Sequence, residues 1–394
     1  MWGSKILLIC FTAALLCAAV LAFVLWSRSP LSETALNYFS KNFLLEASLY
    51  EQQTITVFLL RNVVIWSFLV LLTAATWNHF AKLKELHFLE TVLYIITILV
   101  LLKLLIFPLQ YYRSFILEHS FGLSTQPFSS WLLDYFKGTA LELIITTAVL
   151  TGFFILVKHF PNHWWWIGGT AAVLLLLASA YLHPLIVDPL FYNHYPLKNE
   201  KINHQVTEMA NEAGIDINEV LVADASQRTQ KVNASFSGVG RTRRIVIYDN
   251  LLERYSSEKA LAVIAHEIGH WMHSHLFKGI LLRGALAFLA LYLLSKVYKE
   301  MGINGDLRII TAALIFFALF SFLLFPAQNA LSRTFERQAD AEALRLVEDA
   351  GIHVSLHQQL AKANLSQVDP HPLIKTFLHT HPPAVERINR AVQE

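Results

Sequence analysis

The chain has 394 residues, of which 55% are hydrophobic and 15% are charged, and its formal net charge is +2. This composition excludes an ordinary soluble globular protein, because so large an apolar fraction needs a membrane to bury it. The small net charge and the lack of a long basic run argue against nucleic acid as a partner. We therefore expect an integral membrane protein surrounded by membrane lipid.

Apolar stretches long enough to cross a membrane occur seven times along the chain. About 20 helical residues cross a hydrocarbon core roughly 30 Å thick, and helices satisfy their own backbone groups there. The expected spans are Ile6 to Trp26, about Thr56 to Trp77, Phe88 to Leu109, Thr139 to Val157, Trp164 to Val187, Leu276 to Leu294 and Leu307 to Phe325. The first is too long for a signal-peptide core of roughly 7–15 residues, so we expect a retained anchor.

Residues inside the spans indicate what the helices enclose. Both cysteines, Cys10 and Cys17, lie in the first span, which excludes a disulfide framework and a thiolate zinc site. Charged side chains at bilayer depth normally face protein or water, and such residues occur inside the spans, notably Arg61, Lys103, Glu142 and Arg283. They indicate an interior chamber, with the alternative that Arg61 and Arg283 lie near helix ends and reach the membrane surface.

Polar residues are concentrated in two blocks, Asp188 to His275 and Ser332 to Glu394. The last two spans form a hairpin between these blocks, so both blocks lie on one face of the membrane. Lys and Arg are nearly balanced between the two faces, so the positive-inside rule does not orient the chain. The expected domains are, in chain order, five helices over residues 1–187, the first part of a split soluble domain over 188–275, a helical hairpin over 276–330 and the second part of the soluble domain over 331–394.

The two polar blocks carry the signals of a small mixed domain. Glu219 to Ala223 and Arg244 to Tyr248 are rich in β-branched residues and are separated by glycine-containing sequence, which predicts a strand pair or hairpin. Apolar residues at three- and four-residue steps predict amphipathic helices from Ser257 to His275 and from about Ser332 to Glu348. The predicted fold is mostly α, with seven membrane helices and a split α+β domain on one membrane face.

His266, Glu267 and His270 form an HExxH pattern on the first of these amphipathic helices. Residues four apart lie on one helical face, where two imidazole nitrogens can bind one zinc at about 2.0–2.1 Å while the glutamate lies beside the metal as general base. The alternative is a pair of surface histidines on an amphipathic helix. We expect one Zn²⁺ per chain.

A catalytic zinc needs a third protein ligand and an open position for water. His273 and His275 are close in sequence, but the longer zinc motif requires a histidine where Leu276 stands, so both are expected to be solvated or interfacial. Glu336, on the second amphipathic helix, is the better candidate for the third ligand. Asp340 follows one turn later and can accept a hydrogen bond from a ligand histidine.

The seven spans, the HEIGHW run of His266 to Trp271, and the run from Glu336 to Asp340 after Ser332 and Arg333 resemble the type 1 CAAX prenyl protease family of membrane-embedded zinc metallopeptidases. The resemblance covers nearly the whole chain. Further matching positions lie between spans three and four, at the entry into the soluble domain and around the predicted strands: Glu118, His119, Phe121, Gly122, Ser124, Gln126, Pro189, Leu190, Phe191, Pro196, Leu197, Gly238, Ile245, Val246, Tyr248 and Asp249.

The resemblance implies roles for residues outside the zinc motif. Asn233, Ala234 and Phe236 would belong to an edge strand with which an extended substrate pairs through its backbone. His381 and Arg387, in the HPPAVER run, match the family's residues that stabilise the transition-state oxyanion. Ser124 stands where the family more often has asparagine, a departure that bears on the natural substrate rather than on the chemistry.

The expected function is that of a zinc endopeptidase that cleaves near the C-terminus of prenylated CAAX-type or other membrane-associated polypeptides. The alternatives are a general membrane-protein quality-control protease and a seven-span receptor or transporter that binds zinc. The receptor or transporter leaves Glu267, between the two histidines, unexplained. We expect a multi-pass protein of a bacterial inner membrane or of the endoplasmic reticulum, with the peptidase domain on the cytosolic side.

Overall fold

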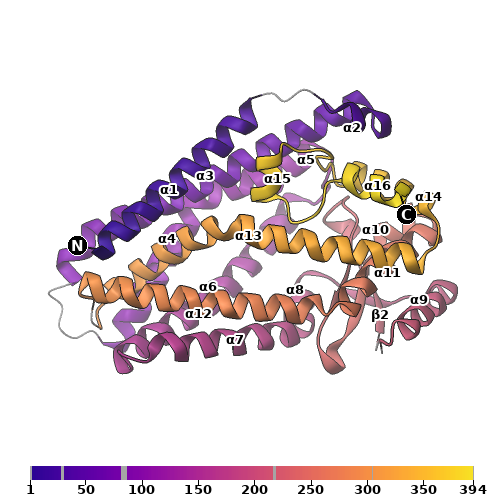
Figure 1. Ribbon diagram of the computed structural model, residues 1–394. Coiled ribbons are helices and arrows are strands. Elements are labelled where there is room, and N and C mark those ends of the chain that lie inside the picture. The colour runs from indigo at the N-terminus through magenta and orange to yellow at the C-terminus, as the bar shows by residue number, and fades with distance from the viewer. Residues whose placement is uncertain (1, 28–30, 81–86, 216–218, 304, 394) are drawn as a thin grey trace.

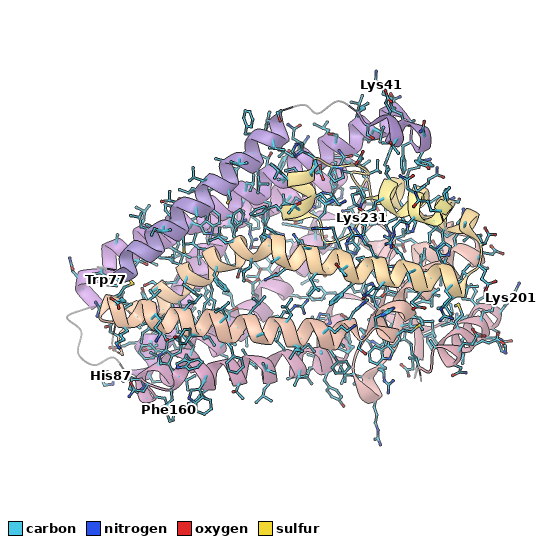
Figure 2. All side chains as sticks on the ribbon, in the orientation of Figure 1. Lys41, Trp77, His87, Phe160, Lys201 and Lys231 are labelled. Atoms are coloured by element: carbon cyan, nitrogen blue, oxygen red, sulfur yellow. The ribbon has the colours of Figure 1, made fainter. Side chains whose placement is uncertain are left out.

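Figure 1 shows a computed structural model of the protein, which describes residues 2–27, 31–80, 87–215, 219–303 and 305–393. Long helices converge at one end of the molecule and spread apart at the other, where a small sheet and the C-terminal helices lie. Trp77, His87 and Phe160 mark the converging end, and Lys41 and Lys201 lie at the opposite end (Figure 2). The soluble elements therefore collect at the wide end of the helical bundle.

Among the described residues, seven helices are long and apolar enough to cross a membrane, and they confirm the seven predicted spans. Their interior packs around large apolar side chains such as Trp66 and Phe322, each 1% exposed. The spanning helices are α1 Trp2–Trp26, α3 Lys41–Phe80, α4 Phe88–Tyr111, α6 Phe128–His159, α7 Trp164–Leu182, α12 His275–Met301 and α13 Arg308–Leu346. A π-helical turn extends two of them, η1 Tyr112–Ile116 after α4 and η2 His183–Val187 after α7.

Helix α13 differs from the sequence prediction in one respect. The last span and the following amphipathic helix were expected to be separate, but both belong to one helix of 39 residues that continues through Pro326. Beyond the proline, the buried residues Asn329, Arg333, Glu336 and Asp340 continue the helical spacing. The change from apolar to polar sequence therefore marks where the helix leaves the apolar surroundings and not where it ends.

The soluble part contains a four-stranded sheet in the order β1-β2-β4-β3. Its strands are β1 His194–Pro196, β2 Glu219–Ala223, β3 Ala234–Ser237 and β4 Arg244–Tyr248. The predicted pairing of β2 with β4 is confirmed, but the two strands run in parallel and so do not form a hairpin, and the antiparallel partner of β4 is β3. The segment that carries β3 supplies the crossover that a parallel pair requires.

The turn between β3 and β4 depends on Gly238. Its φ of +88° is rarely adopted by residues with a side chain, and a Cβ there would lie 2.0 Å from the carbonyl oxygen of Thr242. Because β4 covers only one side of β3, the other edge of β3 is left as the border of the sheet. That border faces the HExxH helix, α11.

The remaining helices lie around the soluble end of the molecule, and only some of them pack against this sheet (Figure 1). A second apolar core joins the sheet to the helices around it, with Val206, Ile245 and Ile268 at its centre. Of the shorter helices, α9 Glu200–Glu212, α10 Asp249–Arg254, α11 Ser257–Met272 and α14 Ala350–Ala363 contribute to this core. The others are α2 Glu33–Tyr38, α5 Leu117–Ser120, α8 Asp188–Phe191, α15 Pro372–Leu378 and α16 Ala384–Gln393, with short 3₁₀ turns at Ala225–Gln227 and Gly240–Thr242.

Candidate active site

A close approach of α11 and α13 assembles the centre of the site. Gly269 allows it, because a Cβ at this position would lie 2.9 Å from both the Cα and the carbonyl oxygen of Ala339 on the facing helix. Real Cβ atoms essentially never come so close to backbone, so a side chain here would push the helices apart. The glycine inside the HEIGH run thus positions the two histidines opposite the second helix.

The predicted metal ligands meet at this contact. His266 Nε2 lies 3.1 Å from His270 Nε2 and 3.3 Å from Glu336 Oε2, and His270 Nε2 lies 3.4 Å from Glu336 Oε1. Ligand atoms around a tetrahedral ion with bonds of about 2.0–2.1 Å are roughly 3.3 Å apart. Two imidazole nitrogens and one carboxylate therefore have the spacing and chemistry to hold a single metal ion.

Asp340 and Arg387 lie on the side of His266 away from the other two predicted ligands: Asp340 contacts the His266 Nδ1 atom, and Arg387 contacts Asp340. Asp340 Oδ1 lies 2.9 Å from His266 Nδ1, although the angle departs from that of an ideal hydrogen bond. Burial lowers the pKa of His266, but its contacts with Asp340 and Glu336 outweigh burial and raise that pKa to about 10. Metal binding requires the neutral ring, so protons and metal compete for it. Arg387 in turn donates to both carboxylate oxygens of Asp340, with Nε at 2.9 Å.

His275 contacts the second predicted ligand, His270, a contact that the sequence did not reveal. Its Nδ1 lies 2.9 Å from His270 Nδ1, and its Nε2 lies 2.8 Å from Gln338 Oε1. With His270 bound to metal through Nε2, its Nδ1–H would donate to His275 and the His275 Nε2–H to the glutamine. His275 is not one of the three residues grouped as possible metal ligands, as expected, but it is only 6% exposed, so it is buried beside His270 and not solvated. His273 instead approaches Glu342 at 3.2 Å.

Glu267 lies between the metal ligands and the sheet. Its Oε2 accepts a hydrogen bond of 3.1 Å from the backbone N–H of Phe236 in β3. Burial raises the pKa of the Glu267 carboxyl above its usual value, with smaller opposing contributions from His266 and His270. A raised pKa suits a carboxylate that must take up a proton near neutral pH.

The residues predicted to bind substrate lie where the edge strand enters the site. Asn233 O accepts from Tyr248 N at 3.0 Å, so this residue already pairs with β4. Ala234 and Phe236 belong to β3, and the Phe236 N–H points away from β4 toward Glu267. Because backbone groups alternate between the two sides of a strand, the outward groups of β3 are available to a further strand.

His381 and Arg387 reach the site from the C-terminal segment. His381 Nε2 lies 3.4 Å from Glu336 Oε1, and 62% of its side chain is exposed toward the cavity described next. Arg387 borders the same cavity while it pairs with Asp340. The structure thus brings both predicted residues to the metal ligands and adds the Asp340 contact to Arg387.

These groups border a cavity of about 840 Å³ between the membrane helices and the soluble elements. The expected interior space is therefore present, but Arg61, Lys103, Glu142 and Arg283 are not among the residues that line it. Lys103 and Glu142 form an ion pair between α4 and α6 instead. Residues that do line the cavity include Tyr50, Arg113, Lys231, Asn233, His266, Glu267, Asp340, His381 and Arg387.

A metal-ligand set with an adjacent glutamate, an edge strand beside it and a cavity among apolar helices define a membrane-embedded metallopeptidase. Comparison with known proteins gives the family. Residues 196–394 match the model of peptidase family M48, and residues 40–193 match the model described as the CAAX prenyl protease N-terminal region with five membrane helices. The chain belongs to peptidase family M48 and is a metalloendopeptidase whose substrates are polypeptides.

Individual relatives agree with this assignment. An uncharacterized metalloprotease of Bacillus subtilis, YhfN, is 30% identical over 341 residues, which are 83% of this chain and 80% of the relative. CAAX prenyl protease 1 of Saccharomyces cerevisiae is 29% identical over 305 residues, which are 71% of this chain and 67% of the relative. The crystal structure of S. mikatae Ste24p has the same fold, with a TM-score of 0.81, 22% identity and coverage of 97% of this chain and 98% of that one.

Proposed function

We propose that this metallopeptidase uses Zn²⁺ and cleaves near the C-terminus of prenylated CAAX-type or other membrane-associated polypeptides. The observation that carries the proposal is the position of Glu267, which lies beside the three ligand atoms and accepts a hydrogen bond from the edge strand. Two nitrogens and one oxygen at tetrahedral spacing suit zinc and leave one position open.

Zinc bound by His266, His270 and Glu336 would polarise the scissile carbonyl and acidify the attacking water. Glu267 would take the proton of that water, while the Phe236 N–H fixes the orientation of its carboxylate. The outward backbone groups of β3 would pair with the substrate and hold its carbonyl beside Glu267.

His381, whose Nε2 lies 3.4 Å from Glu336 Oε1, would donate a hydrogen bond to the developing oxyanion. Arg387 would act in two ways, since its guanidinium lends positive charge to this region and its fork holds Asp340 in place. Asp340 and His275 would fix the rings of His266 and His270 through their Nδ1 atoms.

The substrate class follows from the relatives and from the surroundings of the site. Several relatives bear the name CAAX prenyl protease 1, among them the Saccharomyces cerevisiae protein. A cavity bordered by membrane helices suits a polypeptide tethered to lipid. We further propose that the domains divide after residues 187, 275 and 330. The protein would lie in a bacterial inner membrane or the endoplasmic reticulum, with its peptidase site on the cytosolic side.

The test compares a farnesylated CAAX peptide with the same peptide lacking the lipid, using purified protein in detergent. Zinc-dependent cleavage of the farnesylated peptide, absent in Glu267→Gln, is the expected result. Equal cleavage of both peptides and of unrelated membrane peptides would favour the quality-control alternative. A zinc-loaded protein that cleaves no peptide would contradict the proposal.

A further inference from the structure

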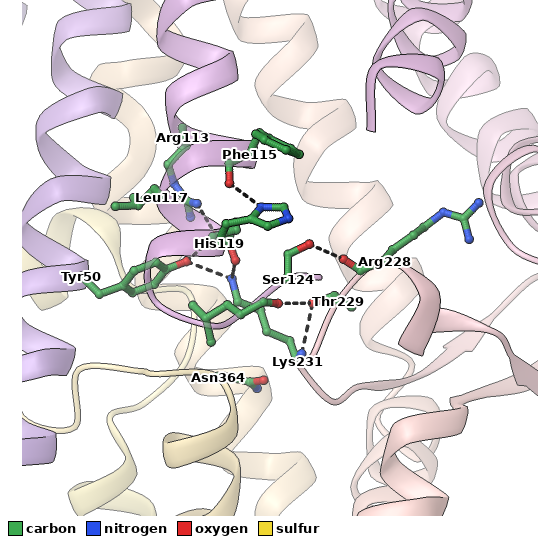
Figure 3. Close-up of polar contacts among 12 residues, drawn as sticks. Tyr50, Arg113, Phe115, Leu117, His119, Ser124, Arg228, Thr229, Lys231 and Asn364 are labelled. Atoms are coloured by element: carbon green, nitrogen blue, oxygen red, sulfur yellow. Dashed lines mark hydrogen bonds and ion pairs between the residues drawn. The ribbon is translucent and has the colours of Figure 1, made fainter. Parts of the chain in front are cut away.

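A second cluster of charged residues borders the same cavity away from the metal ligands. Glu118 accepts hydrogen bonds from Tyr50 Oη at 2.6 Å and from an Arg113 Nη1, and Lys231 Nζ lies 2.8 Å from its other oxygen. Lys231 Nζ also lies 2.9 Å from Tyr50 Oη. Figure 3 shows Tyr50, Arg113 and Lys231 converging on this point. The cluster joins helix α3, the end of α4 and the segment that leads into β3.

The cluster presents positive charge to the cavity. The cluster holds two cations, Arg113 and Lys231, and one carboxylate, Glu118, so the formal charge of the cluster is +1. Tyr50, Arg113 and Lys231 line the cavity, whereas Glu118 is not among the lining residues and has a side chain only 12% exposed. The side chains of Arg113 and Lys231 are each 30% exposed. One cation would neutralise Glu118, so the second is available to an anionic ligand.

Other carboxylates that face the cavity are already engaged. Glu51, one residue after Tyr50, pairs with His379 at 2.7 Å. Asp340 pairs with Arg387, and Glu267 accepts from the backbone of β3. Each of these carboxylates has its own partner, so none of them offsets the net positive charge that Lys231 and Arg113 give the cluster.

The position of Lys231 relates the cluster to the path of the substrate. Lys231 lies five residues before Phe236, whose N–H contacts Glu267, and five extended residues span at most roughly 17 Å. A substrate strand antiparallel to β3 would run from the reacting carbonyl toward Lys231, with its C-terminus leading. About three to five residues after the scissile bond would bring its end to the cluster.

The loop between α5 and α6 holds this segment in place. Leu123 O accepts from Gln230 N at 2.9 Å, and Ser124 Oγ donates to Arg228 O at 2.7 Å. The membrane part of the chain thus fixes Lys231 relative to both Arg113 and the edge strand. A pair of cations held at a fixed distance from the cleavage position can select substrates by the number of residues between the scissile bond and the C-terminus.

We propose that Lys231 and Arg113 bind the terminal α-carboxylate of the substrate and thereby set the distance between cleavage and the C-terminus, while the Tyr50 hydroxyl, which donates to Glu118, accepts from Lys231 and holds it in place. This inference rests on the proposed function, since it concerns the same cavity and the same strand. Charge-assisted hydrogen bonds from lysine and arginine suit a carboxylate, whereas a carboxamide offers them no charge. We expect the free carboxylate to raise kcat/KM by about 10- to 100-fold over the carboxamide.

The experiment measures kcat/KM for one farnesylated peptide in two forms, with a free C-terminus and with a C-terminal carboxamide. In Lys231→Gln the preference for the carboxylate should fall by about tenfold, through loss on the free peptide alone. Lys201→Gln, an exposed lysine on α9, is the matched control and should keep the wild-type ratio. Glu118→Gln removes the competing carboxylate and should raise the ratio.

Lys231→Gln and Glu118→Gln are expected to change the ratio of the two kcat/KM values in opposite directions, and this distinguishes recognition of the carboxylate from a structural role of the cluster. If the cluster only stabilises the fold, Lys231→Gln and Glu118→Gln should lower both kcat/KM values by the same factor, which would overturn the proposal. An anionic lipid bound at the cluster would produce the same uniform loss. Wild-type protein that cleaves both peptides equally well would also overturn it. Failure to cleave either peptide would refute the proposed function itself.

Discussion

The carboxylate of Glu267 faces the metal ligands and receives one hydrogen bond from the backbone of β3. Glu267→Gln keeps both histidines and Glu336, so metal content should not change. An amide cannot accept the proton of the attacking water, and we expect turnover to fall by at least about 10²- to 10⁴-fold. Metal analysis beside a peptide assay checks both parts. Wild-type turnover in this variant would remove Glu267 from the mechanism.

His275 offers a second test at the scale of single residues, with a control only two positions away. His275→Ala removes the acceptor for His270 Nδ1 and should lower metal affinity or activity by about 10- to 100-fold. His273 contacts Glu342 and none of the three ligands, so His273→Ala should retain near-wild-type metal binding. Titration with a competing chelator measures both affinities. Equal affinities in the two variants would contradict the positioning role.

His381 and Arg387 were grouped by their proposed role, but their contacts now predict different behaviour. His381→Ala should leave metal binding intact and lower kcat by about 10²- to 10³-fold with little change in KM. Arg387→Ala also removes the cationic partner of the buried Asp340, which contacts His266, so it should lower metal affinity as well. Arg387→Lys should not restore full activity, since an ammonium group cannot make the two parallel hydrogen bonds that the guanidinium makes with the Asp340 carboxylate. If His381→Ala raises KM alone, His381 binds the ground state of the substrate instead.

At the scale of elements, α11 and α13 determine the site by how closely they approach. Gly269→Ala would place a methyl 2.9 Å from the backbone of Ala339, and we expect a loss of about 1–3 kcal/mol in stability and weaker metal binding. Gly279→Ala on α12 is the matched control, because no atom lies within 4 Å of its added Cβ. Thermal unfolding and metal titration compare the two. Similar effects of both substitutions would refute the role of Gly269 in helix contact.

Elements also show what the sequence could and could not predict. The spans, α11 and the ligand pattern followed from local periodicity, and α13 supplied Glu336 at the expected position. The contact of His275 did not follow, because a continuous α11 would place position 275 about 140° around the helix from His270. Ser274 instead adopts a left-handed conformation with φ of 53°, which ends the helix and turns the next residue back. The parallel pairing of β2 with β4 likewise depends on long-range contacts that no local pattern reports.

At the scale of the whole molecule, the predicted metal ligands come from segments that the membrane hairpin separates. His266 and His270 precede α12, whereas Glu336 follows the apolar part of α13. The cavity also brings together membrane helix α3, the edge strand and the C-terminal segment. The helical bundle therefore helps to hold the two soluble parts of the site together, and a bound metal should stabilise the same arrangement.

Removal of the metal tests this linkage. An ion that binds only the folded state stabilises it by about 2.7 kcal/mol at a concentration 100 times its Kd, so chelation should lower the Tm of the purified protein by several degrees. Tryptophan fluorescence in the bundle and circular dichroism should report the same transition. Glu336→Ala, which lacks one ligand, should show a much smaller response to added zinc. If chelation leaves the Tm of the wild type unchanged, or if the Glu336→Ala variant responds to zinc as strongly as the wild type, the metal does not join α11 to α13 through Glu336.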